Sequence, residues 1–149
     1  MTLIEVSAWL MVLFGGLFGG AILLVAVERV NLWRRMPMAQ YVVDFRRSLY
    51  RSDPLIPAMG VLSGVGAVVY ALQNHGRPAV FAWVGVGLIA LIMVASIVLA
   101  EPVNSKFRRL PEGQAPKGAD RMRIMWRRFH FARTIVALAA LACLAAAVV

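Results

Sequence analysis

Cysteine is almost absent from this sequence. Cys143 is the only one, and it lies inside a long apolar run. A single cysteine excludes a disulfide within one chain and a zinc site built on cysteine ligands. The sequence also lacks GxGxxG, P-loop, HExxH and Ser-His-Asp patterns. We therefore expect no metal site and none of the enzyme classes that these motifs mark.

Acidic residues are scarce as well. Seven Asp and Glu face 16 Lys and Arg, which gives a net charge of +9. In a soluble protein this balance would point to nucleic acid, but 61% of the residues are hydrophobic and the mean hydropathy is +0.76. The charges lie between apolar runs, so anionic lipid and membrane topology explain them better. We expect the lipid bilayer as a partner and no nucleic acid.

Four apolar runs account for most of the chain. They cover about residues 6–27, 55–72, 79–100 and 131–149. Each has the length that a helix needs to cross about 30 Å of hydrocarbon. The first run differs from a secretion signal because it carries Glu5 instead of a basic n-region. The sequence therefore predicts a single transmembrane domain over residues 1–149 with four retained spans.

The segments between the spans complete the predicted fold. Residues 38–50 have apolar residues at helical spacing and basic residues off that stripe, which predicts an amphipathic helix lying at the membrane interface. Residues 73–78 form a tight turn between antiparallel spans. Pro102 is expected to end the third span, and about residues 105–120 read as an exposed loop. The fold class is all-α, an integral membrane four-helix bundle with an additional amphipathic interfacial helix on the cytoplasmic side.

The first span is rich in glycine. Its four glycines form two overlapping small-xxx-small pairs: Gly15, Gly16, Gly19 and Gly20. Such pairs let a second helix approach closely. Two interpretations are open: a homo-oligomer face, or packing inside the bundle of one chain. Gly60 and Gly64 repeat the pattern in the second span and favour the intramolecular interpretation.

The basic residues predict the orientation in the membrane. Of the 16 Lys and Arg residues, all except Arg77 lie within residues 28–54 and 101–133. These two segments are on the same side of a four-span protein, so the positive-inside rule makes that side cytoplasmic. We expect an integral protein of a bacterial-type inner membrane, with both termini outside the cytosol.

The same topology gathers polar residues from three segments at the cytoplasmic end. They are Glu28, Glu101, Asn104, His130 and Arg133. A carboxylate bonded to the imidazole would make His130 a better base, and Arg133 could stabilise an anion on an aromatic substrate. Trp126 and Trp33 could supply apolar walls. The structural alternative is that a glutamate pairs with Arg133, His130 bonds a backbone carbonyl, and nothing reacts.

A family resemblance bears on this choice. The pattern Pro102-Val103-Asn104, a basic loop, and then Trp126-x-x-x-His130-x-x-Arg133-Thr134 resembles the anthrone oxygenase-like family of small four-span membrane proteins. The glycine-rich first span with Glu28 and Asn31 at its end is also similar. The resemblance implies oxidation of anthrones to anthraquinones by molecular oxygen without an added cofactor. It points to Asn104, His130 and Arg133 as site residues, and most relatives have no known reaction.

Three hypotheses follow from the sequence. The first is an oxygenase-like enzyme for a lipophilic aromatic of the anthrone or phenol type, with His130 as base and Arg133 as anion stabiliser. Glu28, Glu101 and Asn104 would complete its catalytic group, and Trp126, Asn31 and Trp33 would bind the substrate. The second is a haem-binding protein or haem-dependent oxygenase with His130 as axial ligand to haem b. The third is a non-catalytic membrane subunit.

Overall fold

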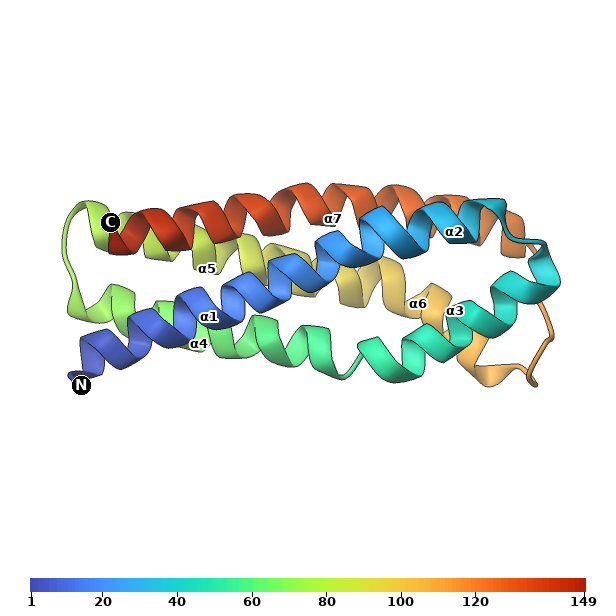
Figure 1. Cartoon of the computed structure of the whole chain (residues 1–149), viewed down its shortest axis with the longest axis horizontal. Coiled ribbons are helices and arrows are strands. Elements are labelled where there is room, and N and C mark those ends of the chain that lie inside the picture. The colour runs from blue at the N-terminus through green and yellow to red at the C-terminus, as the bar shows by residue number, and fades with distance from the viewer.

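The computed structural model describes residues 1–149 and contains helices but no strands. Four long helical rods pack side by side (Figure 1). They are α1 (Leu3–Leu24), the π-helical turn η1 (Val25–Arg29) and α2 (Val30–Arg35); α3 (Met38–Ser52) and α4 (Leu55–Gln73); α5 (Arg77–Ala95), the π-helical turn η2 (Ser96–Ala100) and α6 (Glu101–Arg109); and α7 (Ala119–Val148). Each rod is long and apolar enough to cross a membrane. The predicted integral membrane four-helix bundle is confirmed.

The turn between α4 and α5 is tight, as the sequence predicts. Gly76 has a φ of 66°, which only glycine adopts without strain, and it directly precedes Arg77 at the start of α5. The chain thus reverses direction within Asn74, His75 and Gly76. Helices α4 and α5 then run antiparallel, with both chain termini and this turn at the same end of the bundle (Figure 1).

The core near the termini is built from small residues on α1, α4, α5 and α7. Met11, Phe18 and Leu144 fill it, with alanines from α4, α5 and α7 around them. Helices α1 and α4 approach so closely that a Cβ atom on Gly66 would lie 2.7 Å from the backbone nitrogen of Met11. Close backbone approach supplies dispersion contacts where lipid removes the hydrophobic driving force between helices.

The glycines of α1 face two ways. A Cβ atom on Gly15 would meet Leu144 and Ser63 at 3.0 Å, and one on Gly19 would meet the α7 backbone, so these two glycines serve packing within the chain. A Cβ atom on Gly16 or Gly20 would meet nothing within 4 Å. The outer pair stays available to a second copy, and homo-oligomerisation through these glycines stays a prediction.

A second core fills the opposite end of the bundle with aromatic rings. Trp33 of α2, Tyr41 and Phe45 of α3, Phe107 of α6 and Trp126 of α7 are all buried, and most of their ring pairs meet edge to face at centroid distances of 5.0–6.1 Å. Edge-to-face contact is favourable for aromatic rings. This aromatic cluster holds the four rods together beyond the small-residue core.

Helix α3 corrects the predicted interfacial helix in one respect. It is helical as expected, and its stripe of Tyr41, Val42, Phe45 and Leu49 faces apolar surroundings. Those surroundings are the aromatic cluster, because α3 packs against α6 and continues the α4 rod (Figure 1). The protein itself therefore covers the stripe, whereas the sequence predicted that the stripe faces the membrane.

The third rod continues past the proline that was expected to end it. Pro102 lies in the first turn of α6, directly after the π-helical turn η2, and the helix runs on to Arg109. Proline lacks a backbone N–H, and the π-helical turn before it shifts the hydrogen-bond pattern by one residue, so the rod passes the proline without ending. The exposed loop is consequently shorter than predicted, covering residues 110–118 instead of 105–120.

Candidate functional site

His130 is the central buried polar residue of the basic end. It lies on α7 with 0% of its surface exposed. Its Nε2 is 3.0 Å from the carbonyl oxygen of Ile22 on α1. Its Nδ1 accepts hydrogen bonds from Arg133, with Nε at 3.0 Å and Nη2 at 2.7 Å. Because a guanidinium only donates, Nδ1 must be unprotonated, and Nε2 therefore carries the proton and donates to Ile22.

These contacts bear on two predictions about His130. No carboxylate bonds its ring, although Glu28 or Glu101 was expected there. Both ring nitrogens are already engaged, so a haem iron would have to displace either Ile22 or Arg133 from the ring. Haem ligation by His130 stays a prediction that requires one of these two contacts to break. Its role as a base stays a prediction that requires Arg133 to release Nδ1.

Arg133 is held from three sides by groups without charge. Besides His130, the rings of Trp126 and Phe129 lie under its guanidinium, each with a centroid 5.5 Å from Cζ. It forms no ion pair with any carboxylate, and its Nη1 donates to no protein atom. An arginine inside a membrane protein usually pairs with a carboxylate or backbone carbonyls. Arg133 instead carries an unused donor, and the carboxylate of Asp53 opposes its charge from the same cavity without forming an ion pair.

Trp126 connects His130 to Asn104. Its ring stacks on the imidazole at 4.9 Å with an interplanar angle of 12°, and its Nε1 donates to Asn104 Oδ1 at 3.1 Å. Trp126, His130 and Arg133 share one face of α7 because they fall at i, i+4 and i+7. The predicted grouping of Asn104 with His130 and Arg133 is thus present, with Trp126 as the link between Asn104 and the imidazole. Trp126 itself is buried in the aromatic cluster.

Arg133 and Asn104 open into a cavity of about 450 Å³. The cavity lies between α4 and the α5–α6 rod, with α1 and α7 behind it. Its apolar wall comes from Phe18, Ile22, Ile56, Ile92, Met93 and Ile97, together with two prolines at the start of α4. Its polar side chains are Asp53, Ser96, Glu101, Asn104, Arg108 and Arg133. A volume of this size with a few convergent polar groups suits a small lipophilic molecule that has a polar end.

Arg108 balances the two carboxylates at the mouth of the cavity. It donates to Asp53 Oδ2 at 3.0 Å and also bonds Glu101. Glu101 accepts a further bond from Ser105 at 2.7 Å. Asp53 uses only Oδ2, which Asn104 Nδ2 also approaches at 3.5 Å, and its Oδ1 has no protein partner. Each carboxylate therefore accepts these bonds on one oxygen only, Oε1 of Glu101 and Oδ2 of Asp53, and its other oxygen has no protein partner.

A shallow apolar groove adjoins the cavity. It has a volume of about 320 Å³ and runs between α4 and α5, past Gly64, Val68 and Ile89. Met93 lines both the groove and the cavity. The groove and the cavity therefore lie along the same pair of helices, and the side chain of Met93 lies between them.

Five predicted site residues do not line this cavity: Glu28, Asn31, Trp33, Trp126 and His130. Glu28 pairs with Arg29 at 2.9 Å on the surface, and Asn31 bonds the carbonyl of Val27 at 2.8 Å. Trp33 is buried in the aromatic cluster, where its Nε1 donates to Asp44 at 2.6 Å.

Sequence reasoning missed Asp53 and Arg108. A signal for Arg108 was present, since Glu101, Ser105 and Arg108 fall at i, i+4 and i+7 and share a helix face once α6 is known to continue. Asp53 offered a weaker signal. It stands beside Pro54 at the junction of α3 and α4, a position that reads as a simple helix boundary.

Comparison with known proteins identifies the family. The sequence model of the family described as anthrone oxygenase matches residues 45–143. The chain belongs to the anthrone oxygenase family. No curated protein and no solved structure matches it.

The anthrone oxygenase match contains every polar residue of the cavity, from Asp53 to Arg133. It leaves out Phe18 and Ile22, which form the α1 part of the wall, and also Glu28, Asn31 and Trp33. No group of three or more His, Cys, Asp and Glu residues in this family member is arranged to hold a metal ion. Its polar side chains instead offer two carboxylate oxygens without a protein partner, on Asp53 and Glu101, and one free guanidinium donor on Arg133.

Proposed function

We propose that this protein is a membrane-embedded, oxygenase-like enzyme that oxidises a lipophilic aromatic of the anthrone or phenol type in the cavity of Arg133. The observation that carries the proposal is the unpaired guanidinium of Arg133, which faces an apolar cavity with one donor unused. A cation in that position is stabilised by an anion formed on the ligand. Membership of the anthrone oxygenase family supports the same chemistry.

Three residues have distinct roles in this proposal. Asp53 is the less exposed of the two carboxylates, with 35% of its side chain exposed against 45% for Glu101, and we assign it as the base. Its Oδ1 accepts a proton from the substrate carbon, and Arg133 binds the enolate oxygen that results. Asn104 lines the same wall and orients the ligand. His130 does not line the cavity, so we assign it a positioning role: it holds Arg133 through Nδ1. This changes the role of base that the sequence analysis gave to His130.

The oxidation needs no added reductant. The enolate of an anthrone reacts with oxygen to form a carbon–oxygen bond, and the resulting peroxide loses water as its oxygen–oxygen bond breaks and the carbon gives up its second hydrogen. The methylene carbon supplies all four electrons that reduce the oxygen molecule. One oxygen atom stays as the new carbonyl and the other leaves as water. The proposal therefore calls for molecular oxygen and no cofactor.

The apolar surroundings support a substrate that arrives through the membrane. The groove between α4 and α5 adjoins the cavity at Met93, and eight of the ten residues that line the groove are hydrophobic. A lipophilic aromatic dissolved in hydrocarbon would reach Arg133 by passing Met93. Binding energy from the apolar walls would hold the ring system while the polar end faces Arg133 and Asp53.

The test is oxygen uptake by the purified protein in lipid nanodiscs with 1,8-dihydroxyanthrone as the probe, corrected for its spontaneous oxidation. We expect anthraquinone formation by the wild type, and a loss of about 10²–10³-fold in kcat for Arg133→Met, as for the removal of one oxyanion donor elsewhere. The matched control is Arg128→Met on the exposed face of the same helix, which should keep full activity. An active Arg133→Met variant would refute the role of Arg133, and an inactive wild type would refute an anthrone substrate.

A further inference from the structure

A second cavity lies on the far side of Trp126 from the proposed active site. It is a groove of about 230 Å³ between α2 and α7, and we refer to it as the α2–α7 groove. Arg34, Arg123 and Arg127 line it, and none of its lining residues is acidic. Its floor is apolar, formed by Val30, Trp33 and Ile124 among others. Three cations over an apolar floor form a surface that neither the bundle core nor the proposed reaction explains.

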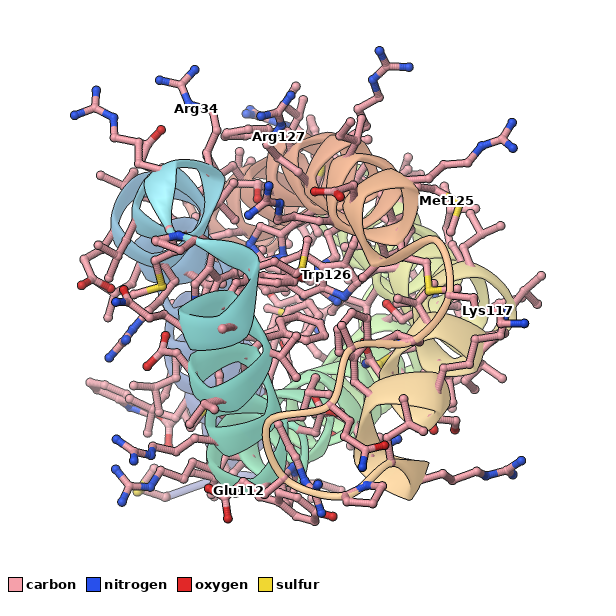
Figure 2. All side chains as sticks on the ribbon, turned by 90° about the vertical axis from the view of Figure 1, so that its right-hand side faces the viewer. Arg34, Glu112, Lys117, Met125, Trp126 and Arg127 are labelled. Carbon is pink, nitrogen blue, oxygen red and sulfur yellow. The ribbon has the colours of Figure 1, made fainter.

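The three arginines are not equivalent. Arg123 is used by the fold: it donates to the carbonyls of Trp33 and Met36 at 3.3 and 3.0 Å and pairs with Asp120 at 3.2 Å. Arg34 and Arg127 form no ion pair and no hydrogen bond with the protein. In the view onto the basic end, their side chains lie next to one another and point away from the helices (Figure 2). They are free to bind an anion together.

An apolar surface continues from this groove along α7. Phe131 and Ile135 follow Arg127 at i+4 and i+8, so they share its helix face, and they are 43% and 71% exposed. Both belong to the fourth span. An anion bound at Arg127 would therefore have hydrocarbon-facing surface directly beside it, which suits a molecule that joins an anionic head to apolar chains.

We propose that the α2–α7 groove is a binding site for the phosphate headgroup of an anionic phospholipid. Arg34 and Arg127 hold the phosphate, since guanidinium groups bind phosphate oxygens with charge-assisted hydrogen bonds. One acyl chain follows Phe131 and Ile135, on the membrane side of Arg127. Arg123 fixes the end of α2 against α7 and so sets the width of the groove. This site is independent of the proposed oxidation.

The experiment compares lipid binding by two charge-matched variants. Native mass spectrometry of the delipidated full-length protein in detergent counts bound phosphatidylglycerol and phosphatidylcholine over a titration. The test variant is Arg34→Gln/Arg127→Gln. The control is Arg35→Gln/Arg128→Gln, which removes the same charge from exposed neighbours in the sequence that lie outside the groove.

We expect wild type to bind phosphatidylglycerol in preference to phosphatidylcholine. A hydrogen bond to a charged group contributes about tenfold or more, so the test variant should lose about 100-fold. The control removes the same charge without removing these bonds and should lose less than about threefold. An equal loss in both variants would show a diffuse electrostatic effect and overturn the site. Equal binding of the two lipids would overturn it as well.

A third arm separates a lipid from a free anion. Inorganic phosphate is added to the wild-type complex at concentrations that match the lipid. If it displaces phosphatidylglycerol at equal concentration, the groove recognises phosphate alone and the assignment to a lipid is wrong. If displacement requires a large excess, the apolar surface beside Arg127 contributes to binding, as proposed. Circular dichroism of each variant establishes that its helices are intact.

Discussion

Arg133 donates two hydrogen bonds, at 3.0 and 2.7 Å, to the same nitrogen of His130, three residues before it on α7. Two donors on one acceptor leave Nδ1 with no free lone pair. The imidazole therefore serves as an anchor for the guanidinium, in the tautomer that the carbonyl of Ile22 requires. The relationship makes Arg133, and not His130, the group presented to a ligand.

The first prediction concerns His130 itself. The amide oxygen of asparagine can replace Nδ1 as the acceptor for Arg133, while glutamine and alanine cannot place an acceptor there. We expect His130→Asn to keep oxidation activity within about tenfold of wild type and His130→Ala to lose about 10–100-fold, the range for a hydrogen bond to a charged group. The dependence of rate on pH should keep its shape in His130→Asn. Equal inactivation of both variants would instead support a base at position 130.

The second prediction concerns the bond between Trp126 and Asn104. Trp126→Phe keeps an aromatic ring but leaves Asn104 Oδ1 buried without its donor, which should lower the unfolding free energy by about 1–3 kcal/mol. Titration with SDS in mixed micelles measures this change. Trp83→Phe on the exposed face of α5 is the control and should change little. In the double variant with Asn104→Leu the two losses should not add, because the residues are in contact.

The third prediction separates two kinds of glycine. Gly66→Ala puts a Cβ atom 2.7 Å from the backbone nitrogen of Met11, so α1 and α4 must separate and the bundle should lose about 1–3 kcal/mol of stability. Gly16→Ala meets open space and should leave the monomer at least as stable as wild type. If Gly16→Ala changes the sedimentation behaviour of the protein in detergent, the outer glycines contact a second copy.

The fourth prediction concerns sidedness. Because every basic residue except Arg77 lies at one end of the bundle, that end should be cytoplasmic. A reporter active only in the cytosol should be silent when fused after Val149 and active when inserted at Gly113, in the exposed loop between α6 and α7. The reverse pattern would contradict the predicted topology.

Length and hydropathy were sufficient to predict the rods, because a run of about 20 apolar residues has few alternatives to a membrane-spanning helix. The grouping of Asn104, His130 and Arg133 was also predictable, since topology placed their segments at one end. The hydrogen-bond partners of these side chains could not be predicted. Nothing in the sequence indicates that Ile22 offers its carbonyl to His130, because backbone groups look alike at every position.

The errors share a physical cause. Pro102 and the amphipathic stripe of α3 were interpreted from local rules, which treat a proline as a stop and an exposed basic face as a sign of the membrane surface. The helix passes Pro102 because a π-helical turn precedes it. The stripe of α3 packs against Trp33, Phe107 and Trp126, which come from distant parts of the chain. Tertiary contacts of this kind are absent from a local pattern.

The number of residues in a π-helical turn determines which side chains of the following helix face the cavity. A π-helical turn bonds i to i+5, so relative to an α-helix it accommodates one extra residue. Each residue of an α-helix turns the chain by about 100°. Deleting one residue from Ser96–Ala100 would therefore rotate Glu101, Asn104 and Arg108 by about a quarter of a turn away from Asp53 and Arg133. The cavity thus depends on the count of residues in this turn as much as on their identity, and a single codon gained or lost there separates a bundle with the polar wall from one without it.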